Sequence, residues 1–143
     1  MTAFLPSPGA KRPMRIFVVE NHEDTRFLLC LLLEQLGHTV FSAPTLAGAL
    51  AAIPAAQCDV LISDIGLPDG NGWDLMTRLG DERPPYAIAM SGFGMSSDRQ
   101  RSLNVGYRHH LLKPVEPNQL ERLLDEAADE TALRAELPRR GEA

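Results

Sequence analysis

Asp64 is the residue of this sequence whose surroundings best suit covalent chemistry. It ends the apolar run Val60-Leu61-Ile62, and a loop rich in proline and glycine follows it at 65–72. Such a run is typical of a strand buried on both faces, and in an open parallel sheet reactive groups gather at the carboxyl ends of the strands. A lone aspartate here more often caps a turn, so its interpretation as a nucleophile depends on its neighbours.

Polar side chains also follow three other predicted strands. Glu20 and Asn21 follow the first strand, Ser91 the fourth and Lys113 the fifth. Because the carboxyl ends of parallel strands meet at one edge of a sheet, we expect these side chains to converge on Asp64. An acidic pair can hold a divalent cation, a hydroxyl and an ammonium group can hold phosphate oxygens, and a carboxylate can accept a phosphoryl group.

The elements that would position these residues alternate along the chain. We predict strands at 15–19, 38–42, 58–64, 86–90 and 109–112, and helices within 21–36, 45–53, 73–79, 96–105 and 118–133. Five strands alternating with five helices imply a parallel sheet covered on both faces, with right-handed crossovers.

Caps and breakers set the expected helix boundaries. Asn21 or Asp24 can cap the first helix, and Gly37 should end it. Pro54 should end the second helix, and Asn118 should open the last one. The apolar residues that recur at helical spacing in the first helix are Phe27, Leu28, Leu31, Leu32 and Leu36.

The length and composition indicate one domain. The chain has 143 residues, of which 44% are apolar and 23% charged, as in an ordinary globular protein. We expect a disordered leader at 1–13, one domain at 14–127, and a helix extension with a charged tail at 128–143.

The length and composition of the chain also argue against several classes of protein. No apolar run approaches the roughly 20 residues needed to cross a bilayer, and residues 1–13 lack the apolar core of a secretory signal. A net charge of -5 without a basic block argues against direct binding of nucleic acid. Cys30 and Cys58 are interpreted as buried thiols, so a reducing cytoplasm is the simplest compartment.

Four short motifs occur in order between residues 14 and 127. They are Val18-Val19-Glu20-Asn21, the Asp64…Pro68…Gly72 loop, Ser91-Gly92 and Lys113-Pro114. Together they resemble the receiver domain of two-component response regulators, although any one alone would be weak. The resemblance implies an α/β, flavodoxin-like (βα)5 three-layer sandwich, whose parallel five-stranded sheet has strand order 2-1-3-4-5.

The resemblance also implies a function, in signalling rather than in enzymatic catalysis. A histidine kinase or a histidine phosphotransfer protein would donate a phosphoryl group to Asp64, and a downstream protein would dock in response. Lys113 and Ser91 would each contact a phosphoryl oxygen, and Gly92 would leave room for the phosphodonor. The Mg²⁺ ligands implied are Glu20, Asn21, Asp64 and the backbone carbonyl of Gly66.

Two positions depart from the receiver pattern. The family usually has a carboxylate where Asn21 stands, so this chain should bind Mg²⁺ more weakly unless Glu23 or Asp24 compensates. The family usually has tyrosine or phenylalanine where His110 stands, three residues before Lys113, and that ring moves inward with the hydroxyl on activation. His110 therefore predicts a weakened or pH-sensitive switch, and an exposed histidine without a switching role is an equal alternative.

Two other functions compete with the phosphoacceptor. A degenerate receiver would be a phosphorylation-independent protein-interaction module, which Asn21 and His110 motivate. A flavin carrier or a phosphohydrolase would need a phosphate-cradling loop after the first strand, or a second aspartate two residues past Asp64, where Gly66 stands instead. Enzymatic activity is therefore the least supported of the three.

The extent of the protein is a separate question. Met1 and the expected leader favour a complete single-domain protein, whereas the segment 91–95 resembles receivers fused to hybrid kinases. The sequence identifies neither the kinase nor the output partner. It also leaves open a homodimer through the face formed by the fourth helix, the fifth strand and the fifth helix.

Overall fold

The computed structural model describes residues 12–92 and 96–136, with side chains up to residue 132. Most of the expected leader, residues 93–95 and the end of the expected tail lie outside the described residues. The elements in chain order are β1 (Arg15–Val19), α1 (Glu23–Gln35), β2 (Thr39–Ala43), α2 (Leu46–Ala56), β3 (Val60–Asp64), β4 (Gly66–Leu67), β5 (Gly70–Asn71), α3 (Gly72–Leu79), η1 (Gly80–Glu82), β6 (Tyr86–Ser91), α4 (Ser96–Asn104), β7 (His109–Leu112) and α5 (Pro117–Glu136).

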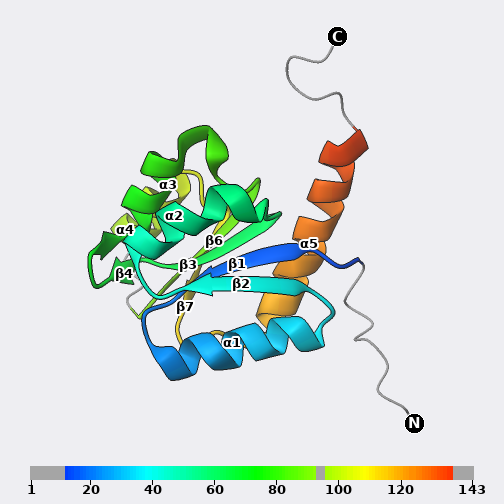
Figure 1. Cartoon of the computed structure of the whole chain (residues 1–143), viewed down its shortest axis with the longest axis horizontal. Coiled ribbons are helices and arrows are strands. Elements are labelled where there is room, and N and C mark those ends of the chain that lie inside the picture. Colours follow the sequence, from blue (N-terminus) through cyan, green and yellow to red (C-terminus); the bar gives the residue numbers. More distant parts are fainter. Residues whose placement is uncertain (1–11, 93–95, 137–143) are drawn as a thin grey trace.

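Five parallel strands form the central sheet in the order β2-β1-β3-β6-β7. Helices α1 and α5 cover one face, and α2, α3 and α4 cover the other (Figure 1). Because β6 and β7 are the fourth and fifth strands of this sheet along the chain, the predicted order 2-1-3-4-5 and the flavodoxin-like sandwich are confirmed. The carboxyl ends of all five strands therefore share one edge.

Side chains of the sheet alternate between two hydrophobic cores. Ile62 of β3 packs with Leu33 and Leu124 on the α1/α5 side, and Leu61 packs with Ile53 and Leu75 on the α2/α3 side. Every residue of β3 is buried, as the apolar run before Asp64 predicted. The strand that carries Asp64 is thus held from both faces.

The buried stripe of α1 differs from the predicted one. Leu29 and Leu33 are its buried residues, whereas Phe27 and Leu28 are 65% and 62% exposed. Five leucines and a phenylalanine in this helix allow more than one apolar stripe, and the contact with the sheet selects the one that contains Leu29. Phe27 and Leu28 are left as apolar surface.

The first turn of α1 is capped by His22, so the predicted caps, Asn21 and Asp24, are wrong. The Thr25 backbone N–H donates to His22 Nδ1 at 3.3 Å. Imidazole nitrogen replaces the side-chain oxygen that usually caps a helix. Gly37, with φ 102°, follows the end of α1 as predicted.

Pro54 does not end the second helix, and this prediction is wrong. Helix α2 continues to Ala56, since the missing proline N–H falls in the last turn and removes only one helical bond. The helix ends at Gln57, which adopts the left-handed conformation with φ 52°. The Gln57 side chain returns to donate to Pro54 O at 2.9 Å.

The last helix starts one residue earlier than predicted. Pro117 is its first residue, a position that suits proline because no intrahelical bond needs its N–H. The Glu116 carboxylate accepts from the backbone N–H of Asn118 at 2.8 Å and of Gln119 at 3.1 Å. The cap is therefore Glu116 rather than Asn118.

The loop after Asp64 contains a small antiparallel hairpin that the sequence did not predict. Gly66-Leu67 of β4 pairs with Gly70-Asn71 of β5. At the hairpin turn the Asp69 carboxylate accepts from Leu46 N at 2.8 Å and Ala47 N at 2.9 Å, at the start of α2. These two bonds attach the hairpin to α2 and so fix the loop beside Asp64.

Within the part of the chain that the structure describes, none of the helices is both long and apolar enough to span a bilayer. Both cysteines are free thiols; Cys58 is buried, as predicted, whereas Cys30 is only half-buried. Burial raises the pKa of Cys58 to about 11.

Candidate functional site

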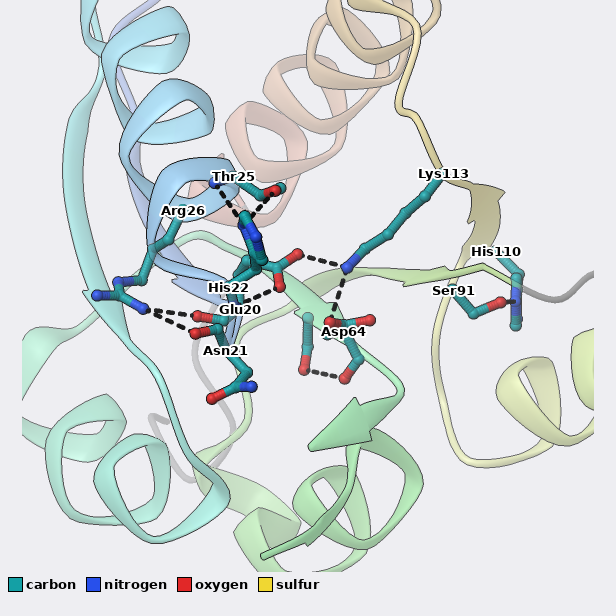
Figure 2. Close-up of polar contacts among 10 residues, drawn as sticks. Glu20, Asn21, His22, Thr25, Arg26, Asp64, Ser91, His110 and Lys113 are labelled. Carbon is teal, nitrogen blue, oxygen red and sulfur yellow. Dashed lines mark hydrogen bonds and ion pairs between the residues drawn. The ribbon is translucent and has the colours of Figure 1, made fainter. Parts of the chain in front are cut away.

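The predicted side chains converge at the carboxyl edge of the sheet. Lys113 Nζ lies 2.8 Å from Asp64 Oδ2 and 2.6 Å from Glu20 Oε1. Figure 2 shows the Glu20 and Asp64 carboxylates pointing at the Lys113 ammonium group, with Ser91 on the side of Asp64 away from Glu20. Residues from three strand ends thus meet around one cation.

Glu20 is held in place by the turn that follows β1. Its backbone N–H donates to Ala43 O at 3.2 Å, which extends the pairing of β1 with β2 by one residue. Its side chain is 1% exposed and accepts from His22 N at 2.9 Å through Oε2. Arg26 donates to the Glu20 carbonyl at 2.9 Å. These bonds leave Oε1 directed at Lys113.

Burial and charge together set the ionisation of this group of residues. Burial raises the pKa of Asp64 to about 6, and the nearby Glu20 charge adds to the rise, although Lys113 opposes it. For Glu20, burial also favours the neutral form, but bonds from Lys113 and the His22 N–H outweigh it and lower the pKa. For Lys113, burial is outweighed by its two carboxylate partners, so its pKa is raised. Near neutral pH two buried carboxylates therefore face one ammonium group.

A cavity of about 350 Å³ lies beside Asp64. Ser91 lines it from the end of β6, and a Cβ on Gly92 would meet nothing within 4 Å among the residues that the structure describes. Trp73 and Asp98 line the cavity from α3 and α4. The space next to the Asp64 carboxylate is thus large enough for a small polar group such as phosphate.

His110 lies behind Ser91 and is half-buried rather than exposed. Its Nε2 is 2.7 Å from Ser91 Oγ, and its Nδ1 is 2.8 Å from Ser102 Oγ. Ser102 also accepts from the Trp73 indole N–H at 2.9 Å. Sequence reasoning named Ser91 and His110 but missed Ser102 and Trp73, because no local pattern links positions on different helices.

Two buried carboxylates opposed by one half-buried lysine, on a doubly wound parallel sheet, define a class of α/β proteins with a charged site at the strand ends. The family described as the response regulator receiver domain matches residues 16–125, so the chain belongs to this family.

Several relatives share this domain. The chain is 36% identical over 118 residues to an uncharacterized 14.6 kDa protein in the sodA1 3' region of Leptolyngbya boryana, covering 79% of this chain and 88% of that one. It is 31% identical over 106 residues to the KDP operon transcriptional regulatory protein KdpE of Escherichia coli, covering 74% of this chain and 47% of KdpE. It is 32% identical over 128 residues to the virulence sensor protein BvgS of Bordetella bronchiseptica, covering 84% of this chain and 10% of BvgS. The chain therefore spans less than half of these two longer relatives.

Solved structures share the fold. A CheY-like response regulator receiver domain protein from Methanospirillum hungatei superposes with a TM-score of 0.80 at 28% identity, covering 86% of this chain and 99% of that one. Receiver domains act with histidine kinases in two-component signalling, and they generally bind Mg²⁺.

The residues present fit a magnesium ion in their donor chemistry. Glu20 and Asp64 offer carboxylate oxygens, Asn21 an amide oxygen and Gly66 a carbonyl, all of which are hard ligands. Glu20 Oε1 is buried and receives no hydrogen bond among the described residues beyond its ion pair with Lys113. The described part of the chain holds no group of three histidine, cysteine or acidic side chains arranged to bind a metal. Water would therefore complete the coordination of an ion held by Glu20, Asn21, Asp64 and Gly66.

Proposed function

We propose that this protein is a phosphoacceptor of a two-component phosphorelay. Asp64 takes a phosphoryl group from the phosphohistidine of a histidine kinase or a histidine phosphotransfer protein, with Mg²⁺ as cofactor. The observation that carries this proposal is the Lys113 ammonium group 2.8 Å from Asp64 Oδ2, next to a cavity of phosphate size. A buried carboxylate with its own cation and an adjacent cavity suits transfer better than a turn cap.

The transfer forms one bond and breaks one. A carboxylate oxygen of Asp64 attacks phosphorus, the bond between phosphorus and the donor imidazole breaks, and that imidazole leaves with a proton. The pKa of about 6 leaves Asp64 ionised at neutral pH, and hence nucleophilic. Lys113 offsets the repulsion between two anions, and Ser91 lines the space that the phosphoryl oxygens would enter.

Mg²⁺, when bound by Glu20, Asn21, Asp64 and the Gly66 carbonyl, would supply further positive charge against that repulsion. The Asn21 side chain brings no charge of its own, so the ion should bind more weakly than with a carboxylate at this position.

The phosphodonor protein would dock beside α1. Phe27, Leu28 and Leu31 form an exposed apolar patch on this helix. A groove of about 480 Å³, with Thr25, Leu28, Lys113 and Val115 among its lining residues, runs from this patch to the lysine. A partner helix seated in this groove would contact Lys113, and Lys113 contacts Asp64, so the docking face lies next to the reaction site.

Phosphorylation would change docking elsewhere on the domain. The added charge on Asp64 would attract the Ser91 hydroxyl and so move His110 and the adjoining α4 surface, which a downstream protein would read. The cytoplasm is the compartment in which histidine kinases present this donor, and we place the protein there.

Mass spectrometry of the intact protein tests this function. Incubation with a small acyl phosphate and Mg²⁺ should add one phosphoryl group to the wild-type protein and none to Asp64→Asn. Chelation of Mg²⁺ should abolish the adduct. An unmodified wild-type protein would reject the proposal and favour the phosphorylation-independent interaction module, for which the uncharged Asn21 is the supporting observation.

A further inference from the structure

A chain of hydrogen bonds leads from the pocket beside Asp64 to the α3/α4 surface. It runs from Ser91 Oγ to His110 Nε2 (2.7 Å), from His110 Nδ1 to Ser102 Oγ (2.8 Å), and from Ser102 Oγ to the Trp73 indole nitrogen (2.9 Å). Ser102 is fully buried, and the Arg101 guanidinium lies 4.1 Å from the centre of the Trp73 ring. A polar path therefore joins the site to exposed residues.

The chemistry of the four groups fixes the direction of this chain. An indole nitrogen can only donate, so Trp73 donates to Ser102 Oγ. Within the described residues, the buried Ser102 hydroxyl has His110 Nδ1 as its remaining partner, so its proton goes to that nitrogen. Nδ1 is then an acceptor, and the neutral imidazole carries its proton on Nε2.

The tautomer of His110 in turn constrains Ser91. Nε2–H donates to Ser91 Oγ, so the Ser91 hydroxyl cannot give its own proton to His110. That proton is directed to another acceptor, and Ser91 lines the same cavity as Asp64. The opposite tautomer would turn the Ser91 proton toward the imidazole and away from the cavity.

We propose that His110 is a positioning residue whose Nε2–H tautomer, set by Ser102 and Trp73, orients the Ser91 hydroxyl to donate to a phosphoryl group on Asp64. This proposal rests on the function proposed above. It differs from a switch that works by ring size, because it needs both imidazole nitrogens. It also makes Ser102, which is fully buried on α4 and does not line the cavity, a determinant of the site.

The tautomer can be read without any phosphodonor. In ¹⁵N spectra of the imidazoles, recorded where His110 is neutral, the wild-type protein should show a protonated Nε2 and a bare Nδ1, with the signals assigned by their loss in His110→Phe. Ser102→Ala and Trp73→Phe should each shift the His110 signals toward a mixture of tautomers. Ser97→Ala, which removes an exposed hydroxyl from the same helix, should leave them unchanged.

The functional readout is the rate of Asp64 phosphorylation by a small acyl phosphate at saturating Mg²⁺. Loss of one oriented hydrogen bond should slow the reaction by about fivefold in Ser102→Ala and Trp73→Phe. His110→Phe, which keeps a ring but loses both nitrogens, should slow it at least as much. His110→Gln, which keeps an N–H donor, should recover part of the rate.

These two readouts separate the possible failures. A wild-type His110 with its proton on Nδ1 overturns the proposal, as does a Ser102→Ala protein with an unchanged tautomer and rate. If Ser102→Ala does not fold, Trp73→Phe decides in the same way. A wild-type protein that forms no adduct rejects the proposed function, and the role of His110 falls with it whatever the tautomer.

Discussion

Lys113 Nζ donates to Asp64 Oδ2 at 2.8 Å, although 49 positions separate the two residues in the chain. The same ammonium group lies 2.6 Å from Glu20, so one cation holds two buried carboxylates at the edge of the sheet. Because negative charge exceeds positive charge here, the site favours a further cation.

Replacing Lys113 should raise the pKa of Asp64. In Lys113→Met the opposing charge is lost while burial and Glu20 remain, so the pKa should rise above its value of about 6. Lys113→Arg, which keeps the charge, should change it less. The ¹³C shift of the Asp64 carboxyl followed against pH, without Mg²⁺, measures this, and an unaltered titration in Lys113→Met would contradict the role of the ion pair.

Asp64 should make the folded state less stable as the pH rises. Its pKa is about 6 when folded and near the ordinary 3.8 when unfolded, so the folded state binds more protons between these values. The free energy of unfolding therefore falls as the pH rises through this window and is level above it. Asp64→Asn cannot titrate and lacks this loss. Its free energy of unfolding should therefore rise relative to that of the wild type by on the order of 2–3 kcal/mol from pH 4 to pH 7.

Urea unfolding of both proteins in the presence of a chelator measures this difference. Comparison of the two is needed because Glu20, whose pKa is lowered, contributes stability that is lost as the pH falls. A difference between the two proteins that is constant across the range would show that burial does not raise the pKa of Asp64.

Gly72 should not tolerate a side chain. A Cβ at this position would lie 2.7 Å from the Asp64 carbonyl oxygen and 3.0 Å from the Tyr107 hydroxyl. Gly72→Ala should lower the free energy of unfolding by about 1–3 kcal/mol, because backbone and a buried ring must move. Gly92→Ala, where a Cβ meets no described residue within 4 Å, is the matched control and should stay within about 0.5 kcal/mol of wild type. Equal stabilities of the two variants would contradict the close packing at Gly72.

Asn21→Asp should bind Mg²⁺ more tightly than the wild-type protein. The substitution adds a charged oxygen ligand beside Glu20, and we expect an affinity about tenfold higher, equivalent to about 1.4 kcal/mol. The single tryptophan, Trp73, lines the cavity and offers a fluorescence signal for the titration. Asn104→Asp adds the same charge at the end of α4 and should have little effect. Equal gains in both variants would point to net charge rather than ligation.

Periodicity and strand-end residues were enough to predict the parallel sheet and the convergence of Glu20, Asp64, Ser91 and Lys113, whereas the strand order came from the resemblance to receiver domains. These features follow from rules that act locally or on the whole sheet: buried strands are apolar, and parallel strands end at one edge. The caps were predicted less well, because His22 and Glu116 are not among the usual capping residues and Asp69 caps a helix that lies far away in the sequence.

The link between His110, Ser102 and Trp73 could not be predicted from the sequence. Trp73 and Ser102 lie on different helices, and only the packing of α3 and α4 brings the indole N–H to the hydroxyl. His110 was identified because it departs from the receiver pattern. Ser102, its second partner, is a serine within a polar helix, and nothing in the sequence distinguishes it from its neighbours. The exposure of Phe27 was missed for a related reason, since the helix could have turned either apolar face to the sheet.

Reductive cleavage would identify the phosphoryl acceptor, which we propose to be Asp64. Borohydride converts an aspartyl phosphate to homoserine, so peptides from protein treated with a small acyl phosphate and Mg²⁺ should show homoserine in place of Asp64 and nowhere else. Conversion of Asp69, Asp74 or Asp98 with Asp64 left intact, or no conversion in any peptide, would contradict the account.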